Sequence, residues 1–365
     1  MNIVLIEPFF TGSHKLWAIE FKKYSSHNIE IISLPGRFWK WRMHGGAITL
    51  AKKYNKLNFE PDLILVTDML NLPVFQSLIK PKCPIHIYFH ENQFTYPWSP
   101  IDKDVLYQRD KHYGFINYSS ALSANHIYFN SHFHFDSFFT GLESFLRQFP
   151  DYREIQNIER IRSKSSVLNL GIDLKKFDSF EIKKQNKVPL ILWNHRWEYD
   201  KNPELFFKIL INLSKQKFNF NLAIIGQKFK TEPKCFYEAR NILNKHIVQF
   251  GYVESFEQYA YWLWKADVLP VTSIHDFFGI SIMEAIYCKT IPILPRGLTY
   301  PTLFKEKENP ELFYDTDQNL YQILKLILEK NIILDYQKYS KIANNYDWSN
   351  LINYYDKTLT ANTSK

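Results

Sequence analysis

The feature that most constrains the fold is a regular alternation of short apolar runs with longer stretches of helical pattern. Each run is nearly continuous and rich in β-branched or aromatic residues, as buried parallel strands require. Strands that alternate with helices indicate βαβ units and therefore an α/β fold. In the first half the predicted strands are residues 3–6, 30–33, 63–67, 85–89, 127–129 and 167–170, and the clearest helices are 106–122 and 133–148.

A polar passage divides this alternation in two. Residues 173–187 contain five lysines and no apolar periodicity, so we expect a linker there. The pattern then restarts, with predicted strands at 190–193, 222–225, 247–250, 268–271 and 291–294. A chain of 365 residues is long enough for two such domains. We predict a first domain over 1–172, a second over 188–330, and C-terminal helices over 331–365 that pack back toward the first domain. Two doubly wound domains would face a central cleft at the carboxyl ends of their strands.

Composition narrows the class of protein. Lys and Arg outnumber Asp and Glu by 45 to 37, which suits a phosphate-rich partner. Three cysteines without a C-x-x-C pair indicate a reducing compartment and argue against a zinc ribbon or a disulfide scaffold. Residues 1–7 lack the basic region of a signal peptide, and no apolar stretch approaches the length of a spanning helix. We therefore expect a cytoplasmic protein without membrane insertion.

The strongest local signal is the string SIHDFFGISIMEA at residues 273–285. Gly279 precedes a helical stretch whose first amides, at Ile280 and beyond, would face an anion such as a phosphate. Glu284, one turn into that helix, would accept hydrogen bonds from ribose hydroxyls, and Asp276 would bind sugar hydroxyls. A helix cap by Asp276 with a solvated Glu284 is the structural alternative.

A basic loop follows the first strand of the second half. The string LWNHRWEYDKNP at residues 192–203 runs from that strand to a proline that can open a helix. Arg196 would bind a diphosphate as a fork, and Lys201 would bind it as a point charge. Solvated cations on a surface loop are the alternative.

Two polar segments follow predicted strands in the first half. In PFFTGSH, at residues 8–14, Gly12 permits a close approach of the backbone to a phosphate. In HENQ, at residues 90–93, His90, Glu91 and Asn92 would face the cleft, with His90 in contact with the donor sugar or the acceptor. A histidine that only caps the loop is the alternative.

A third segment mixes cations with indole rings. It contains Arg37, Trp39, Lys40 and Arg42, a combination that suits stacking on bases and contact with phosphates. A buried tryptophan pair with cations that reach solvent is equally common.

Two strings imitate metal sites. HFHFD at residues 132–136 spells a chelating pattern, but residues two apart on a helix do not face each other. Asp315 and Asp317 spell D-x-D near a helix start, where acidic side chains are expected for other reasons. We predict no metal and no cofactor besides the substrates.

These motifs resemble those of a known superfamily and of one family within it. The string at 273–285 resembles the E-x7-E motif of retaining GT-B glycosyltransferases, with Asp276 in place of the first glutamate. LNLGID at 168–173 resembles a passage that precedes their second domain, and the loop at 192–203 resembles their diphosphate loop. Six strings look like the tRNA-queuosine α-mannosyltransferase family, namely PFFTGSHK, WKWR, YFHENQ, FNS, NHRWE and HDFFG.

The resemblance covers most of residues 1–305 and implies a GT-B fold, two Rossmann-like domains with a helical C-terminus. It implies transfer of mannose from GDP-mannose, or of another hexose from its nucleotide, to queuosine at the wobble position of tRNA, with retention of configuration. Arg196, Lys201, Asp276 and His90 would then be catalytic, chiefly by stabilising the departing diphosphate. Three alternatives stay open: a glycosyltransferase for lipid or polysaccharide acceptors, a nucleotide-sugar epimerase, and a non-catalytic RNA-binding protein on the same scaffold.

Overall fold

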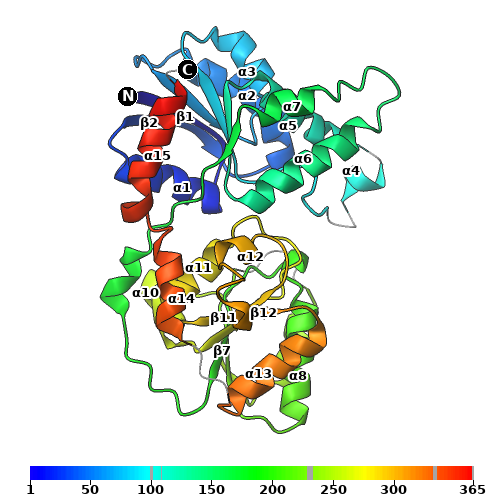
Figure 1. The fold of residues 1–365 in the computed structure, drawn as a ribbon, viewed down its shortest axis with the longest axis vertical. Helices are drawn as coiled ribbons and strands as arrows, with labels where there is room; N and C mark the ends of the chain where they lie inside the picture. The colour runs from blue at the N-terminus through cyan, green and yellow to red at the C-terminus, as the bar shows by residue number, and fades with distance from the viewer. Residues whose placement is uncertain (99–101, 108, 228–232, 332–334, 364–365) are drawn as a thin grey trace. The chain divides into compact units, whose positions relative to one another are not determined.

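The computed structural model describes residues 1–98, 102–107, 109–227, 233–331 and 335–363. The chain forms two compact units, one of Met1–Ile172 with Trp348–Lys365 and the other of Asp173–Asp347. Each unit contains a six-stranded sheet with flanking helices (Figure 1), and all the strand pairs in both sheets are parallel. The predicted α/β class is confirmed.

The first sheet has the strand order β2-β1-β3-β4-β5-β6. Its strands are β1 Asn2–Phe10, β2 Asn28–Pro35, β3 Leu63–Thr67, β4 Ile85–Phe89, β5 His126–Phe129 and β6 Ser165–Val167. The helices of this unit are α1 Gly12–Tyr24, α2 Trp39–Tyr54, α3 Leu72–Ile79, α4 Lys103–Leu106, α5 Lys111–Ser123, α6 His132–Leu146, α7 Asn157–Arg162 and α15 Trp348–Thr363. Every residue of β3 and β4 is buried, which explains their uninterrupted apolar sequences. The last strand lies slightly earlier than the predicted 167–170.

The second sheet has the strand order β12-β11-β10-β7-β8-β9. Its strands are β7 Leu190–Trp193, β8 Asn221–Ile224, β9 Ile247–Phe250, β10 Val268–Pro270, β11 Ile291–Pro295 and β12 Phe313–Tyr314. The helices and 3-10 turns are η1 Lys175–Phe180, η2 Tyr199–Lys201, α8 Pro203–Lys215, α9 Cys235–Ile242, α10 Phe256–Lys265, α11 Ile280–Tyr287, α12 Tyr300–Leu303, η3 Pro310–Leu312, α13 Asp317–Leu328 and α14 Tyr336–Asn344. Trp193 and Trp197 are fully buried in this core, in contact with the ring of Phe236.

The strand order reverses once in each sheet. The reversal lies between β1 and β3 in the first sheet and between β7 and β10 in the second. Connections that leave two neighbouring strands at such a point diverge to opposite faces, and the crevice between them is where ligands bind in parallel α/β sheets. The loops after β1, β3, β7 and β10 are therefore the first places to look for a site.

The structure divides the chain differently from the predicted linker. Residues 173–187 belong to the second unit, where Phe177 is fully buried against Phe256 and its carbonyl accepts a hydrogen bond from the Trp264 indole at 2.9 Å. Lys184 donates to the carbonyl oxygens of Ala266 and Lys289. The lysine-rich composition suggested solvation, but one buried phenylalanine and one partly buried lysine anchor the segment.

The C-terminal helices also separate. Helix α14 packs on α11 in the second unit, whereas α15 packs on α1 in the first (Figure 1). At the start of α15 the indole of Trp348 is fully buried and donates to Glu20 at 2.9 Å. Among the described residues of 331–365, α15 therefore belongs to the first unit, as the predicted return of this segment requires, whereas α14 belongs to the second.

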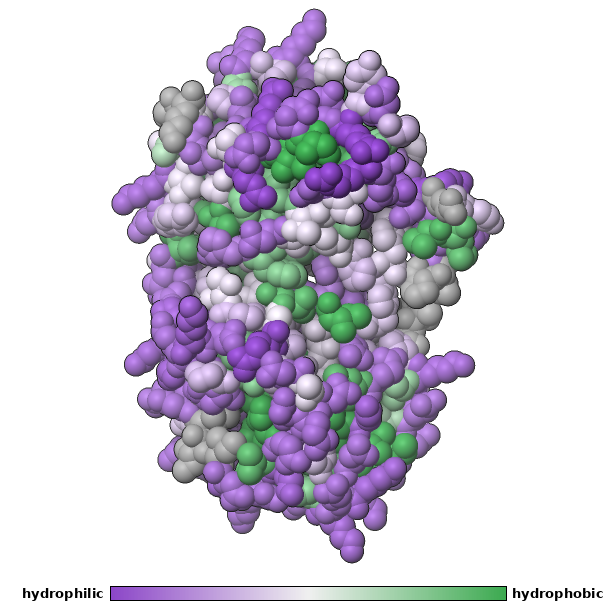
Figure 2. Space-filling model, turned by 45° about the vertical axis from the view of Figure 1, so that its right-hand side comes forward, coloured by the Kyte–Doolittle hydropathy of each residue, from purple (hydrophilic) through white to green (hydrophobic). Residues whose placement is uncertain are grey.

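The surface carries no extended apolar face in the view of Figure 2, where apolar side chains lie in small groups among hydrophilic ones. Within the described ranges, no helix is both long enough and apolar enough to cross a bilayer. Many of the large apolar side chains lie instead in buried clusters, of which one is built on each sheet.

Candidate active site

The reversal point of the second sheet carries an ion pair between two predicted site residues. Lys201 ends the 3-10 turn after β7, and Asp276 lies in the loop after β10. The Lys201 ammonium lies 3.1 Å from the carboxylate of Asp276 and 3.2 Å from that of Asp200, and it donates to the carbonyl oxygen of His275. The side chain of Lys201 is only 9% exposed and that of Asp276 only 15%, so water screens their attraction weakly.

The electrostatics of this pair keep both groups charged. Burial alone would lower the pKa of Lys201, but Asp276 and Asp200 outweigh it and hold that pKa above its usual value. Burial alone would raise the pKa of Asp276, but Lys201 and the Tyr300 hydroxyl, which donates to it at 2.7 Å, hold that pKa below its usual value. Each of the three ammonium protons of Lys201 already has an acceptor in these groups. Lys201 can therefore attract a diphosphate through its charge, or donate to it directly once one of the three present hydrogen bonds is broken.

Gly279 leads directly into α11. Its φ of +86° lies in the left-handed region, and a Cβ at this position would meet the Cδ1 of Ile282 at 3.1 Å. Ile280 is the first residue of the helix, so its amide belongs to the turn that lacks intrahelical acceptors. Gly279 and Ile280 thus have the geometry that phosphate binding at a helix start requires.

Glu284 is a buried carboxylate on α11. The alternative interpretation, in which Glu284 is solvated, is therefore wrong. It accepts a hydrogen bond from the Tyr259 hydroxyl at 2.7 Å, and the ammonium of Lys176 lies 3.8 Å away. Burial raises the pKa of Glu284 above its usual value, although Lys176 and Tyr259 oppose the rise. A carboxylate held in this way is a fixed acceptor for hydroxyl groups.

The loop after β7 is tied to the start of α11. The Asn194 amide donates to the carbonyl oxygen of Ser281 at 2.7 Å, and Nδ1 of His195 lies 3.2 Å from the Ser281 hydroxyl. Burial and then the charge of Lys201 lower the pKa of His195 to about 3, so this ring is neutral. The Arg196 guanidinium contacts Glu198 at 3.1 Å and is 47% exposed. The motifs at residues 192–203 and 273–285 therefore lie together in the structure, although neither sequence motif by itself indicates the other.

In the first unit, buried side chains meet at the carboxyl ends of β1 and β4. Nδ1 of His14 lies 3.1 Å from the Glu7 carboxylate, and these side chains are 8% and 0% exposed. The His90 ring packs against His14 with 4.3 Å between centroids and against the Trp17 edge at 4.7 Å. Gly12 connects these elements with a φ of +50°, and open space lies where its Cβ would be.

The sequence pointed to His90 and missed Glu7 and His14. Burial alone would lower the pKa of His14, but Glu7 raises it to about 9, so His14 carries a proton at neutral pH. Burial and then the charge of His14 hold the pKa of His90 well below its usual value. The His90 backbone amide donates to Asp68 at 2.8 Å, and its buried Nε2 bonds no described residue. A neutral imidazole with an unused nitrogen is suited to a substrate hydroxyl.

Glu7, His14 and His90 are also the one trio in the described ranges whose metal-binding atoms all lie within 4.8 Å of one another. The prediction of no metal did not consider this trio. Metal binding requires a neutral imidazole, and the proton that Glu7 holds on His14 opposes it.

The two strings that imitate metal sites have other contacts. Asp315 lies 2.7 Å from the Arg296 guanidinium, and Asp317 lies 3.2 Å from the Lys208 ammonium. His134, within the 132–136 string, is buried with its Nδ1 3.0 Å from the side chain of Asn130. Asp315 and Asp317 therefore form ion pairs, and the helix cap expected from an acidic residue is supplied by Thr316.

The predicted tRNA-binding cations differ in their surroundings. Lys40 lies 2.6 Å from both Asp102 and Asp104, so it ties α2 to α4 rather than standing ready for a phosphate. Arg37 is exposed, and Arg42 is partly exposed with its Nε donating to the carbonyl oxygen of Pro35.

The aromatic residues of the same segment are also divided. Trp39 is half-buried, with its ring 5.7 Å from that of Trp98 and 5.1 Å from that of Tyr113. Phe38 and Trp41 belong to the same string, and their side chains are 73% and 64% exposed. These two rings, and not Trp39, are the ones that can stack on a base.

The loop after β4 is built around Asn92, which is fully buried. Its side-chain oxygen accepts from the backbone amides of Phe94 and Thr95, so it shapes the loop and does not face solvent, unlike the predicted acceptor contact. Glu91 is partly exposed and accepts from the Gln93 amide at 3.2 Å.

Comparison with known proteins places this site in a family. Residues 2–172 match the N-terminal domain of tRNA-queuosine alpha-mannosyltransferases, and residues 175–346 match the group 1 glycosyl transferases. A tRNA-queuosine alpha-mannosyltransferase of Drosophila melanogaster is 32% identical over 334 residues, which cover 87% of this chain and 85% of that protein. The chain belongs to the tRNA-queuosine alpha-mannosyltransferase family. It is a glycosyltransferase, and neither an epimerase nor a non-catalytic scaffold.

Solved structures share the fold at low sequence identity. A glycosyltransferase from Rickettsia africae is 17% identical with a TM-score of 0.64, and the match covers 100% of this chain and 98% of that one. A sucrose-phosphate synthase from Thermosynechococcus elongatus is 12% identical with a TM-score of 0.67, over 99% and 100% of the two chains. These likenesses confirm the GT-B architecture expected for the family member.

Proposed function

We propose that this chain transfers mannose from GDP-mannose to queuosine at the wobble position of tRNA, with retention of configuration and without a metal ion, in the cytoplasm. The observation that carries the proposal is the match of its first unit to a domain specific to this family, joined to a general glycosyltransferase unit. The buried charges at the second reversal point supply the chemistry that such a transfer needs.

The second unit would bind the donor. The amides at Gly279 and Ile280 would face the diphosphate, and Glu284 would accept from the ribose. As the bond from the sugar to the phosphate breaks, negative charge grows on the departing diphosphate. Arg196, which is half-exposed, and the buried charge of Lys201 would stabilise that charge, and water would screen the contribution of Lys201 only weakly. The departing phosphate would take the proton of the acceptor hydroxyl.

The direct test is a panel of nucleotide-sugars incubated with queuosine-containing tRNA, followed by mass spectrometry of the nucleosides. A hexose added to queuosine from GDP-mannose, undiminished in excess EDTA, is the expected result. If the product forms from another nucleotide-sugar instead, that sugar is the one transferred and mannose is not. Loss of the product in EDTA and its return with one added metal would overturn the metal-free reaction, and the places to test next would be Asp315 with Asp317 and the trio of Glu7, His14 and His90.

Glu284→Gln is expected to weaken GDP binding by roughly 1.5–3 kcal/mol, the range for a hydrogen bond that involves a charged group. The amide keeps the shape of the side chain but loses the charge that holds the ribose hydroxyls. Isothermal titration calorimetry of the folded variant measures this loss. Tyr259→Phe is the matched control, since it removes a hydroxyl bonded to Glu284 and leaves the carboxylate. Parental affinity in Glu284→Gln would contradict the assignment of the donor site.

Arg37→Ala combined with Arg42→Ala is expected to weaken tRNA binding and to lower the slope of log affinity against log salt by about one to two. The reason is that each exposed guanidinium near α2 would release counterions on meeting a phosphate. Filter binding at several salt concentrations measures the slope. Lys40→Ala is the contrasting variant, because this lysine already pairs with Asp102 and Asp104. An unchanged slope in the double variant would mean that Arg37 and Arg42 do not contact the RNA phosphates.

A further inference from the structure

A cavity in the first unit lies beside the loop that carries Glu91, and none of the steps above uses it. Its volume is about 480 Å³, which falls within the range of small-molecule sites. We propose that it binds one nucleobase of the single-stranded RNA loop that presents the acceptor. This inference rests on the proposed function, because it requires an RNA acceptor.

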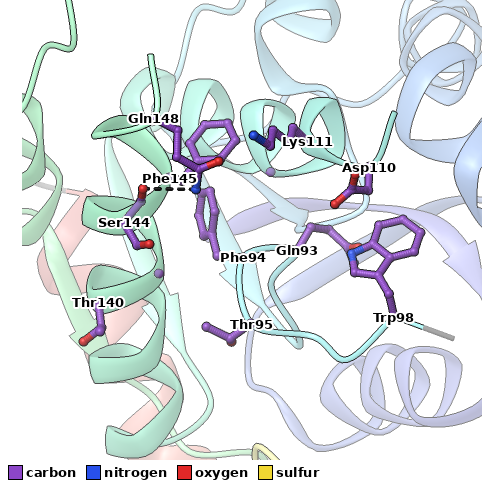
Figure 3. Close-up of a pocket in the computed structure, with 12 residues that line it drawn as sticks. Gln93, Phe94, Thr95, Trp98, Asp110, Lys111, Thr140, Ser144, Phe145 and Gln148 are labelled. Carbon is purple, nitrogen blue, oxygen red and sulfur yellow. Dashed lines mark hydrogen bonds between the residues drawn. The ribbon is translucent and has the colours of Figure 1, made fainter. Parts of the chain in front are cut away.

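Aromatic rings stand on two sides of this base cavity (Figure 3). Trp98 lies on one side, and Phe94 and Phe145 lie on the other. The ring of Trp98 is supported by those of Trp39 and Tyr113, each with its centroid 5.7 Å away. Rings that are already held in place lose little conformational entropy when a flat base stacks on them.

Polar groups line the rest of the base cavity. Gln93 contributes a carboxamide, and Asp110 and Lys111 stand at the start of α5. No side-chain hydrogen bond or ion pair joins Asp110 or Lys111 to another described residue. The edge of a base carries both donors and acceptors, so a carboxylate, an ammonium and an amide together match it.

The cavity is preformed, because its loop is packed tightly against two helices. A Cβ at Gly141 of α6 would lie 2.6 Å from the Cβ of Phe94, and one at Gly114 of α5 would lie 3.2 Å from the Phe94 ring. Asn92 fixes the same loop through its hydrogen bonds to the amides of Phe94 and Thr95. A fixed loop between two glycine-bearing helices holds the rings in one geometry.

Two further observations favour RNA as the source of the base. The cavity belongs to the unit that matches the family-specific domain, whereas the general glycosyltransferase features lie in the other unit. Through the contact of Trp39 with Trp98, it also adjoins the start of α2, where Arg37 and Trp41 are exposed. A neighbouring base and its phosphate would meet those two side chains.

Ser144 offers a test that leaves the core intact, since it is exposed on α6 at the wall of the cavity. Ser144→Trp places an indole in the space of the base. Glu143→Trp is the matched control, because it adds the same ring to an exposed position of the same helix that does not line the cavity. Both variants retain every residue assigned to the donor site.

The expected result is that Ser144→Trp raises the KM for queuosine-containing tRNA about tenfold or more, as loss of one stacked base implies. Affinity for GDP stays at the parental value, and so does the KM of Glu143→Trp. Free queuosine nucleoside, used as a second acceptor, identifies the base. An equal loss with the nucleoside means that the cavity holds queuosine itself, and a loss with tRNA alone means that it holds a neighbour.

A parental KM for tRNA in Ser144→Trp, with an active parent, overturns the inference and leaves the proposed function standing. If the parent transfers no hexose to any tRNA, the proposed function is wrong, and so is the inference that the cavity binds a base of the acceptor.

Discussion

Lys201→Ala is expected to lower the turnover of hexose transfer by about 10²–10³-fold, the usual cost of removing one preorganised group that stabilises developing charge. The same change leaves the carboxylates of Asp200 and Asp276 buried without their cation. Breaking a buried pair from one side costs about 3–5 kcal/mol, so the second unit should also lose stability. Steady-state kinetics and urea unfolding measure the two losses.

A double variant separates the two effects. Lys201→Met with Asp200→Asn removes one opposing charge together with the ammonium, so part of the stability should return. Turnover should not return, because the positive charge beside the departing diphosphate is still absent. Turnover near the parental value in Lys201→Ala, or rescue of turnover by the double variant, would show that Lys201 only supports the fold.

His14→Gln is expected to remove a pH-dependent part of the stability of the first unit. Glu7 raises the pKa of His14 from 6.5 to about 9 in the folded chain. At 1.36 kcal/mol for each pKa unit, this rise corresponds to about 3 kcal/mol of stability. A raised folded-state pKa gives stability that is fully present below pH 6.5 and is lost as the pH rises through about 9.

The difference between parent and variant reports the charge of His14, including its effect on the neighbouring Asp68. Burial also raises the pKa of Asp68, to about 8, so stability falls with rising pH in both proteins. Hydrogen exchange of the amides in β1 and β3 reports on this unit at each pH. The advantage of the parent should be large at pH 6 and small above pH 9. A difference that stays constant over this range would mean that the proton lies elsewhere.

The sequence predicted the two sheets because their signal is local. Each buried strand is itself a continuous apolar run, as in β3 and β4, so no knowledge of distant neighbours is needed. The signal for the start of α11 is also local, because Gly279 and the apolar residues that follow it indicate a helix start. Boundaries were less reliable wherever one buried side chain decides them, as Phe177 does in the predicted linker.

The pairings within the site could not be predicted, because they join residues far apart in the chain. Lys201 and Asp276 belong to different motifs, and only the adjacency of β7 and β10 brings them together. Lys40 looked like a free cation, since its acidic partners lie in a later segment. The sequence gives only a weak indication of the pair of Glu7 and His14, namely a carboxylate and an imidazole on either side of the turn at Gly12.

The docking of α15 on the first unit also governs when that unit can be completed as the chain leaves the ribosome. The Tyr355 hydroxyl accepts from Trp17 and donates to the Asn169 carbonyl, and Asp356 accepts hydrogen bonds from Ser25 and Ser26. None of these bonds exists until synthesis has passed the whole of the second unit, which ends at residue 347. The first unit therefore cannot be completed before the second has been synthesised, and the surface of α1 that α15 covers is exposed until then.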